Sequence, residues 1–127
     1  MIAAPIPMCE SFSDISDTES FGFRLREFLD RFRDYPSVEL ISEEPAFLSP
    51  TLMDEGKADA FLASTAMFLA QKHSLPIPNW AKGNSRALKR PWFAAKTHNL
   101  RMILLQESPP AFRVRNLFVS ANALSRA

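Results

Sequence analysis

Residues 54–73 read DEGKADAFLASTAMFLAQKH, and this stretch decides the fold. The main apolar stripe recurs at the spacing of one helical face and consists of Ala58, Phe61, Leu62, Thr65, Phe68 and Leu69. Four further alanines and Met67 leave few polar positions on the other faces. Because a helix that is apolar nearly all round is normally buried, we predict a central helix over residues 54–73.

A second helix is predicted from Thr18 to Asp34. Its apolar stripe consists of Phe21, Leu25, Phe28, Leu29 and Phe32. Ser16 followed by Glu19 resembles a capping box. Pro36 requires the helix to end before it, because the residue preceding a proline avoids the helical region. This amphipathic helix needs another element to cover its phenylalanines.

The remaining elements are predicted to be shorter. Ser49-Pro50 is typical of a helix start, and a third helix is expected from a cap at Thr97 to Glu107, with Leu100, Ile103 and Leu104 facing inward. A short helix is expected within 108–115, an extended or turn-like segment at 117–119 and a last helical turn at 121–126. Residues 74–96 form a long connection, with one helical turn expected near 85–89, and long connections are often functional.

These patterns predict an all-α fold, a small single-domain bundle of about four to six helices. Ten prolines against three glycines, with no alternating strand pattern, favour helices joined by stiff connections. Residues 1–17 are rich in serine, proline and aspartate and are predicted to be a flexible, acidic and disordered tail, which leaves 18–127 as the helical domain. A single cysteine and the absence of a signal-like or membrane-spanning stretch favour a cytoplasmic location.

Charge is divided unevenly between the two halves of the chain. Residues 1–60 carry thirteen acidic and five basic side chains, a net charge of −8, whereas residues 61–127 carry ten basic and one acidic, a net charge of +9. Such asymmetry indicates either a partner of opposite charge or one half neutralising the other in the fold.

No constellation of residues points to catalysis, to a cofactor or to a metal. His73 and His98 lie 25 positions apart and the one cysteine lies in the predicted tail, so the spacing of a zinc site is missing. His98 follows Thr97 at a helix start, where a capping role accounts for the pair. The carboxylates near residue 54 suit the first turn of a helix. We therefore predict that the chain is not an enzyme.

Binding to a macromolecule is the better-supported class of function. Basic residues between Lys82 and Arg115 are interleaved with Trp80, Trp92, Phe93 and Phe112, a composition that suits a protein interface and also nucleic acid. The candidate binding residues are Arg86, Lys89, Arg90, Arg113, Arg115 and Asn116. A third alternative is an enzyme site completed by a partner chain, in which three of these arginines recognise a phosphate or carboxylate.

Three stretches also carry a resemblance to a family. These are Ala70 to Trp80, the PWF of 91–93, and ESPPAFRVRNLFVSANALSRA at 107–127, the last of which matches ESPxAFRxRNxFVSxxxLxRA. In this order they resemble a family of small uncharacterised bacterial proteins, and also the C-terminal part of some helix-turn-helix regulators. The resemblance covers residues 20–127, and no helix-turn-helix motif accompanies it here, which argues against operator binding by this chain.

The family's genes often lie beside those of nucleotidyltransferase-like proteins, in an arrangement that resembles toxin–antitoxin pairs. The resemblance therefore implies a non-enzymatic interaction module, the antitoxin-like partner of a nucleotidyltransferase-type toxin. The alternative is a nucleic-acid-binding regulatory protein that uses the basic C-terminal half.

Overall fold

A computed structural model describes residues 6–83, 85–120 and 124 of the chain. The elements follow one another as α1 (Met8–Ser11), α2 (Thr18–Asp34), the 3₁₀ helix η1 (Val38–Leu40), α3 (Ser49–Leu52), α4 (Lys57–Lys72), the 3₁₀ helix η2 (Asn79–Ala81), β1 (Trp92–Phe93), α5 (His98–Glu107), α6 (Pro110–Arg113) and β2 (Leu117–Phe118). The fold is mostly helical, as predicted, with one short two-stranded sheet that an all-α fold does not include. None of the described helices is long and apolar enough to cross a membrane.

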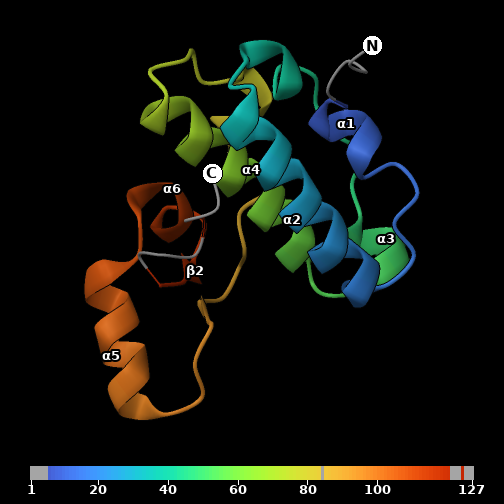
Figure 1. Ribbon diagram of the computed structural model, residues 1–127. Coiled ribbons are helices and arrows are strands. Elements are labelled where there is room, and N and C mark those ends of the chain that lie inside the picture. The colour runs from blue at the N-terminus through green and yellow to red at the C-terminus, as the bar shows by residue number, and fades with distance from the viewer. Residues whose placement is uncertain (1–5, 84, 121–123, 125–127) are drawn as a thin grey trace.

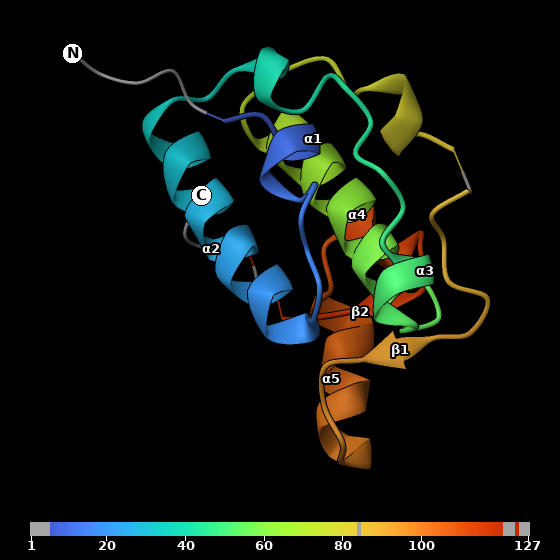
Figure 2. The same ribbon diagram turned by 90° about the vertical axis from the view of Figure 1, so that its right-hand side faces the viewer.

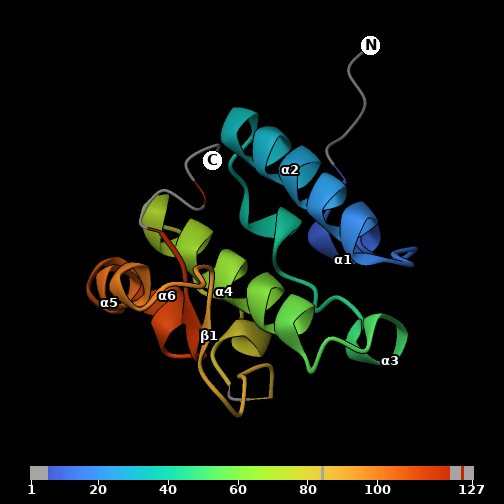
Figure 3. The same ribbon diagram turned by 90° about the horizontal axis from the view of Figure 1, so that it is seen from below.

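Helix α4 lies at the centre of the molecule, between α2 on one side and α6 on the other (Figures 1 and 3). Its alanines at 60, 63, 66 and 70 are fully buried, and their small side chains let neighbouring elements approach closely. The predicted central helix is confirmed, but it starts at Lys57. Gly56 adopts a left-handed conformation (φ 88°), and Asp54 accepts hydrogen bonds from Gly56 N–H and Ala58 N–H, so residues 54–56 form the cap rather than the helix.

Helix α2 has the predicted bounds and covers one side of the core. Phe28, Leu29 and Phe32 are buried on its inner face. The capping box, however, is formed by Asp17 and Ser20, each accepting a hydrogen bond from the other's backbone N–H, and the predicted pair of Ser16 and Glu19 does not form it. The observed pair has the same spacing of three residues as the predicted one but lies one position later in the chain, and it uses a carboxylate and a hydroxyl.

The prediction of a disordered tail over residues 1–17 is wrong for residues 8–15. Met8 to Ser11 form α1, and Met8, Phe12 and Ile15 are buried in the core. The ring of Phe12 packs against those of Phe21 and Phe28 on α2. The apolar side chains of 8, 12 and 15 recur at intervals that fit a single face, and this pattern outweighs the polar residues between them. Residues 1–5 lie outside the described part of the chain.

The long connection after α4 ends in the sheet. Strands β1 and β2 pair in parallel, with Trp92 beside Leu117 and Phe93 beside Phe118, and the rings of Phe93 and Phe118 stack at 4.8 Å. The expected extended segment at 117–119 is thus β2, while the turn of helix expected near 85–89 does not form among the residues described there. The last helical turn expected at 121–126 falls on residues outside the description, except for Leu124, which is buried.

Candidate functional site

The six candidate binding residues do not share one open surface. Arg86 and Arg115 are each 2% exposed, Asn116 is half-buried, and Lys89, Arg90 and Arg113 are exposed. Two arginines of the predicted cationic surface therefore belong to the interior, and each is held there by specific contacts.

Arg86 ties the connection after α4 to the acidic half of the chain. Its guanidinium lies 3.5 Å from Asp59 and 3.2 Å from Glu44, and it donates a hydrogen bond to the carbonyl of Pro45. The rings of Phe47 and Trp80 flank it at 4.2 and 5.3 Å. Asp59 in turn accepts hydrogen bonds from Leu48 N–H and Ser49 N–H. The buried pair of Arg86 and Asp59 therefore neutralises a positive charge of the second half of the chain with a negative charge of the first half.

Arg115 is buried among backbone carbonyls. It donates hydrogen bonds to the carbonyls of Ala81 and Ala111, and its guanidinium touches the sulfur of Met67. Burial lowers the pKa of the Arg115 guanidinium from its usual value, because the charged form loses solvation. Arg115 joins α4, η2 and α6 and is not available to a partner.

Two other candidates fix the backbone near α5 and the sheet. Arg113 donates to the carbonyls of Ser108 and Gln106, the last carbonyls around the end of α5. Asn116 has a positive φ of 63° and donates from its side chain to the carbonyl of Leu88, which holds the connection against the start of β2. Both residues therefore hold backbone segments in place, although the side chain of Arg113 remains exposed.

Lys89 and Arg90 lie in the open part of the connection. They line a cleft of about 780 Å³ between the start of α4 and residues 85–92. Lys57 from α4 lines the same cleft and lies 5.5 Å above the ring of Trp92. This cleft is where the exposed Lys89 and Arg90 of the connection meet the half-buried Lys57 of α4.

Helix α5 forms where the sequence predicted it, after the cap at Thr97, but its exposure was not predicted. It projects from the body below α6 in two perpendicular views (Figures 1 and 2). We predicted that Leu100, Ile103 and Leu104 face inward, but only Leu104 is buried, whereas Leu100 and Ile103 are 51% and 50% exposed. Met102 and Leu105, at 46% and 40%, add two more exposed apolar side chains to the same helix. Four large apolar side chains that are 40–51% exposed on one helix are unusual for the surface of a folded domain.

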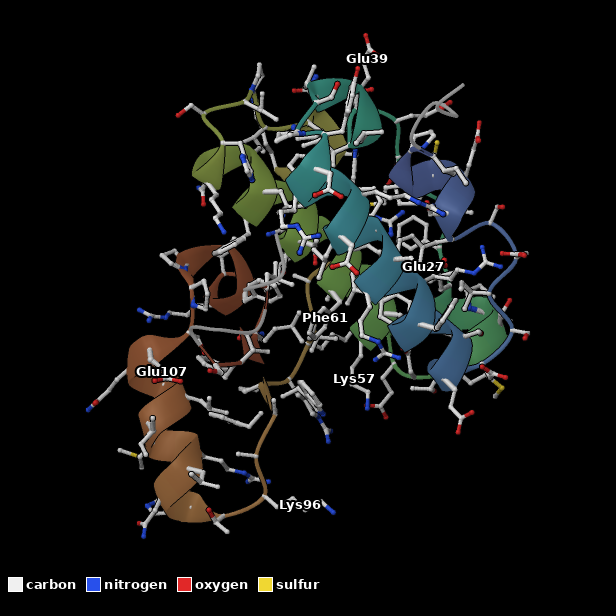
Figure 4. The ribbon with its side chains drawn as sticks, viewed as in Figure 1. Glu27, Glu39, Lys57, Phe61, Lys96 and Glu107 are labelled. Atoms are coloured by element: carbon white, nitrogen blue, oxygen red, sulfur yellow. The ribbon has the colours of Figure 1, made fainter. Side chains whose placement is uncertain are left out.

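Positive charge surrounds the first half of α5. Lys96 extends from the turn that precedes the helix, while Glu107 lies at the opposite end (Figure 4). Arg101 lies over the ring of Phe93 at 5.5 Å and donates to the carbonyl of Ala95. The apolar surface of α5 is therefore bordered by cations on the side of the sheet.

The groups with nucleophilic or metal-binding chemistry are dispersed. The pKa of the Cys9 thiol is raised, by partial burial and by the carboxylate of Glu43, which disfavours the reactive thiolate. Thr97 caps α5 by accepting from Leu100 N–H, as predicted, and His98 beside it is exposed. Within residues 6–83, 85–120 and 124, no three His, Cys, Asp or Glu side chains are grouped so as to hold a metal ion.

Comparison of the chain with models of known protein families, with curated proteins and with solved structures gave no match.

Proposed function

We propose that this protein is a non-enzymatic interaction module that binds a partner protein through α5. The exposure of Leu100, Met102, Ile103 and Leu105 on one projecting helix carries the proposal. Large apolar side chains gathered on one element are the usual mark of a protein interface. An amphipathic or apolar helix that enters a hydrophobic groove of a partner is a common mode of recognition.

The partner that fits α5 has an apolar groove with an acidic border. Lys96 precedes the helix (Figure 4), Arg101 belongs to it, and Arg113 donates to the carbonyls at its end. Complementary charge across an interface directs association and selects the partner. The resemblance to the bacterial family makes a nucleotidyltransferase-type toxin the specific partner that we propose. An antitoxin-like protein would then neutralise this toxin by covering its surface.

The test replaces two exposed apolar residues by charges. In the variant Leu100→Glu/Ile103→Glu, complex formation with a nucleotidyltransferase-type toxin of the proposed kind should be lost, since two carboxylates would enter the apolar groove. The circular dichroism spectrum and the melting temperature should stay near those of the parent chain, because both side chains are half exposed. Isothermal titration calorimetry measures the binding.

Phe23→Glu provides the matched control. Phe23 is 54% exposed on α2, so its replacement places one carboxylate at a similar exposure on another face, against the two of the α5 variant. This variant should bind like the parent chain. Equal binding by the α5 variant and by the control would refute the role of α5, and a complex without effect on the partner's activity would refute the antitoxin-like role.

Nucleic-acid binding is the second candidate, and Lys89, Arg90 and Lys96 favour it as exposed cations next to Trp92 and Phe93. The burial of Arg86 and Arg115 removes two of the cations on which this alternative relied. A salt titration of binding to single-stranded and double-stranded oligonucleotides tests it, because phosphate contacts make affinity fall steeply with salt. Absence of binding at low salt would exclude it.

A further inference from the structure

Strand β1 has one paired edge and one open edge. Trp92 N–H donates to the carbonyl of Asn116, and Ala94 N–H donates to the carbonyl of Phe118, so both residues direct their N–H groups toward β2. In a parallel ladder, alternate residues face opposite edges. The N–H and C=O of Phe93, between these two residues, therefore point away from β2, and no hydrogen-bond partner for them lies within the described residues.

A groove accompanies this strand. It measures about 600 Å³ and is lined by residues 91–96 and Arg101. Pro91 and Trp92 also line the cleft that contains Lys89 and Arg90, so the two hollows meet at the beginning of β1. The lining runs over six residues, which in extended form span roughly 20 Å, enough for a short peptide.

Cations flank the strand at both ends. The cleft at its beginning is also lined by Glu55 and by Asp59, and Asp59 is paired with Arg86. Lys89 and Arg90 precede the strand, Lys96 follows it, and Arg101 lines the groove beside it. Between these cations lie Trp92 and Phe93, which are half-buried aromatic residues. An extended segment with acidic residues at its ends and apolar residues in its middle is complementary to this arrangement.

We infer that the open edge of β1 binds an extended, acidic segment of a partner protein, which adds to the sheet as a third strand. Backbone hydrogen bonds to Phe93 would hold the segment, and the flanking cations would select its charge. Unpaired strand edges readily accept a further strand, and proteins usually cover or block them. This surface shares Lys96 and Arg101 with the border of α5, but its centre is the backbone edge of β1 and not the apolar side chains of α5. The inference therefore goes beyond the proposed function and stands without it.

The test uses a synthetic fluorescein-labelled peptide of about six residues, with glutamates at its ends and valines in its middle, which matches the length of the groove and the order of its charges. Fluorescence anisotropy should show saturable binding, and hydrogen exchange followed by NMR should show slower exchange of Phe93 N–H in the complex. The same peptide with N-methyl groups on alternate residues cannot donate to the strand, so it should bind at least about tenfold more weakly.

Charge reversal tests the electrostatic part. Lys96→Glu should weaken peptide binding about fivefold, because like charges would then meet at one end of the groove. Lys72→Glu, an equally exposed change at the far end of α4, should leave binding unchanged. The Leu100→Glu/Ile103→Glu variant should still bind the peptide, which separates a failure at the strand edge from a failure at α5.

Four outcomes would overturn the inference. These are absence of binding at a peptide concentration of about 1 mM, equal binding of the N-methylated peptide, and unchanged exchange of Phe93 N–H in the complex. The fourth is that a second copy of the chain, or a single-stranded oligonucleotide of equal charge, protects Phe93 N–H better than the peptide does.

Discussion

Helices α4 and α5 are both rich in apolar residues, yet they have opposite surroundings. Ten residues of α4 are buried, whereas Leu104 is the one buried residue of α5, and the structure describes both helices in full. Helix α4 carries alanines that let α2 and α6 approach it. Helix α5 carries leucine, isoleucine and methionine with no described element to cover them. Apolar character thus identifies a surface that needs covering, but the cover can be the chain itself or a partner.

The largest effect on stability is expected at the buried charge of α4. Asp59→Ala should lower the free energy of unfolding by about 3–5 kcal/mol, because Arg86 would lose its buried counter-ion. The N–H groups of Leu48 and Ser49 would lose their acceptor as well. Urea denaturation measures the loss. Glu44→Ala removes the other, more exposed partner of Arg86 and should cost less than about 1 kcal/mol. Equal losses in the two variants would contradict this account.

A cavity created in the core beside α4 should have the next largest effect on stability. Leu62 is fully buried, and Leu62→Ala should lower the free energy of unfolding by about 3 kcal/mol through lost apolar burial and an unfilled space. Thermal and urea denaturation both report it. A loss below about 1 kcal/mol would mean that α4 is not the centre of the core.

The cap of α2 should contribute less, in a way that depends on pH. Hydrogen bonds from Ser20 lower the pKa of the Asp17 carboxyl, so its ionised form stabilises the folded state. This contribution is fully present above the unfolded-state pKa of about 4 and is lost as the pH falls through the lower folded-state value. Asp17→Ala should therefore be less stable than the parent chain at pH 7, and the difference should shrink below about pH 4.

Ser16→Ala is the control for the cap of α2. Ser16 belongs to the capping pair that the sequence suggested and the structure does not contain. Its replacement should leave the stability unchanged at every pH. A pH-dependent loss in Ser16→Ala, with none in Asp17→Ala, would restore the original capping pair.

The smallest effect on stability is expected in α5. Leu100→Ala should change the free energy of unfolding by no more than about 0.5 kcal/mol, because half of this side chain is already in water. The same substitution should weaken partner binding, which isothermal titration calorimetry measures against Phe23→Ala. A destabilisation similar to that of Leu62→Ala would show that α5 packs in a core and would remove the contrast with α4.

The long periodic helices were predictable from the sequence because their patterns are local. The bounds of α2 agree with the prediction, and α4 differs only where Asp54 and Gly56 form a cap. The strand pair was not predictable, because two residues on each side are too few to show alternation. Its partners Trp92 and Leu117 are brought together by tertiary contacts such as the hydrogen bond from Asn116 to Leu88.

The candidate site was less predictable, for two reasons. Charge composition does not reveal which arginines find buried acceptors, and Arg86 and Arg115 found them in segments distant in the sequence. Apolar periodicity also assigned Leu100 and Ile103 to the core. It identifies residues that favour burial, but it does not show whether another element of the fold packs against them.

The hydroxyl of Ser108 connects the two proposed binding surfaces. It is buried, it donates to the carbonyl of Leu104 in the last turn of α5, and it accepts from Val119 N–H directly after β2. Strand β2 is in turn paired with β1 by the hydrogen bonds of the parallel sheet. A continuous series of hydrogen bonds through Ser108 thus joins the two proposed binding surfaces. Any factor by which occupancy of α5 changes affinity at the strand edge must equal the factor by which occupancy of the edge changes affinity at α5.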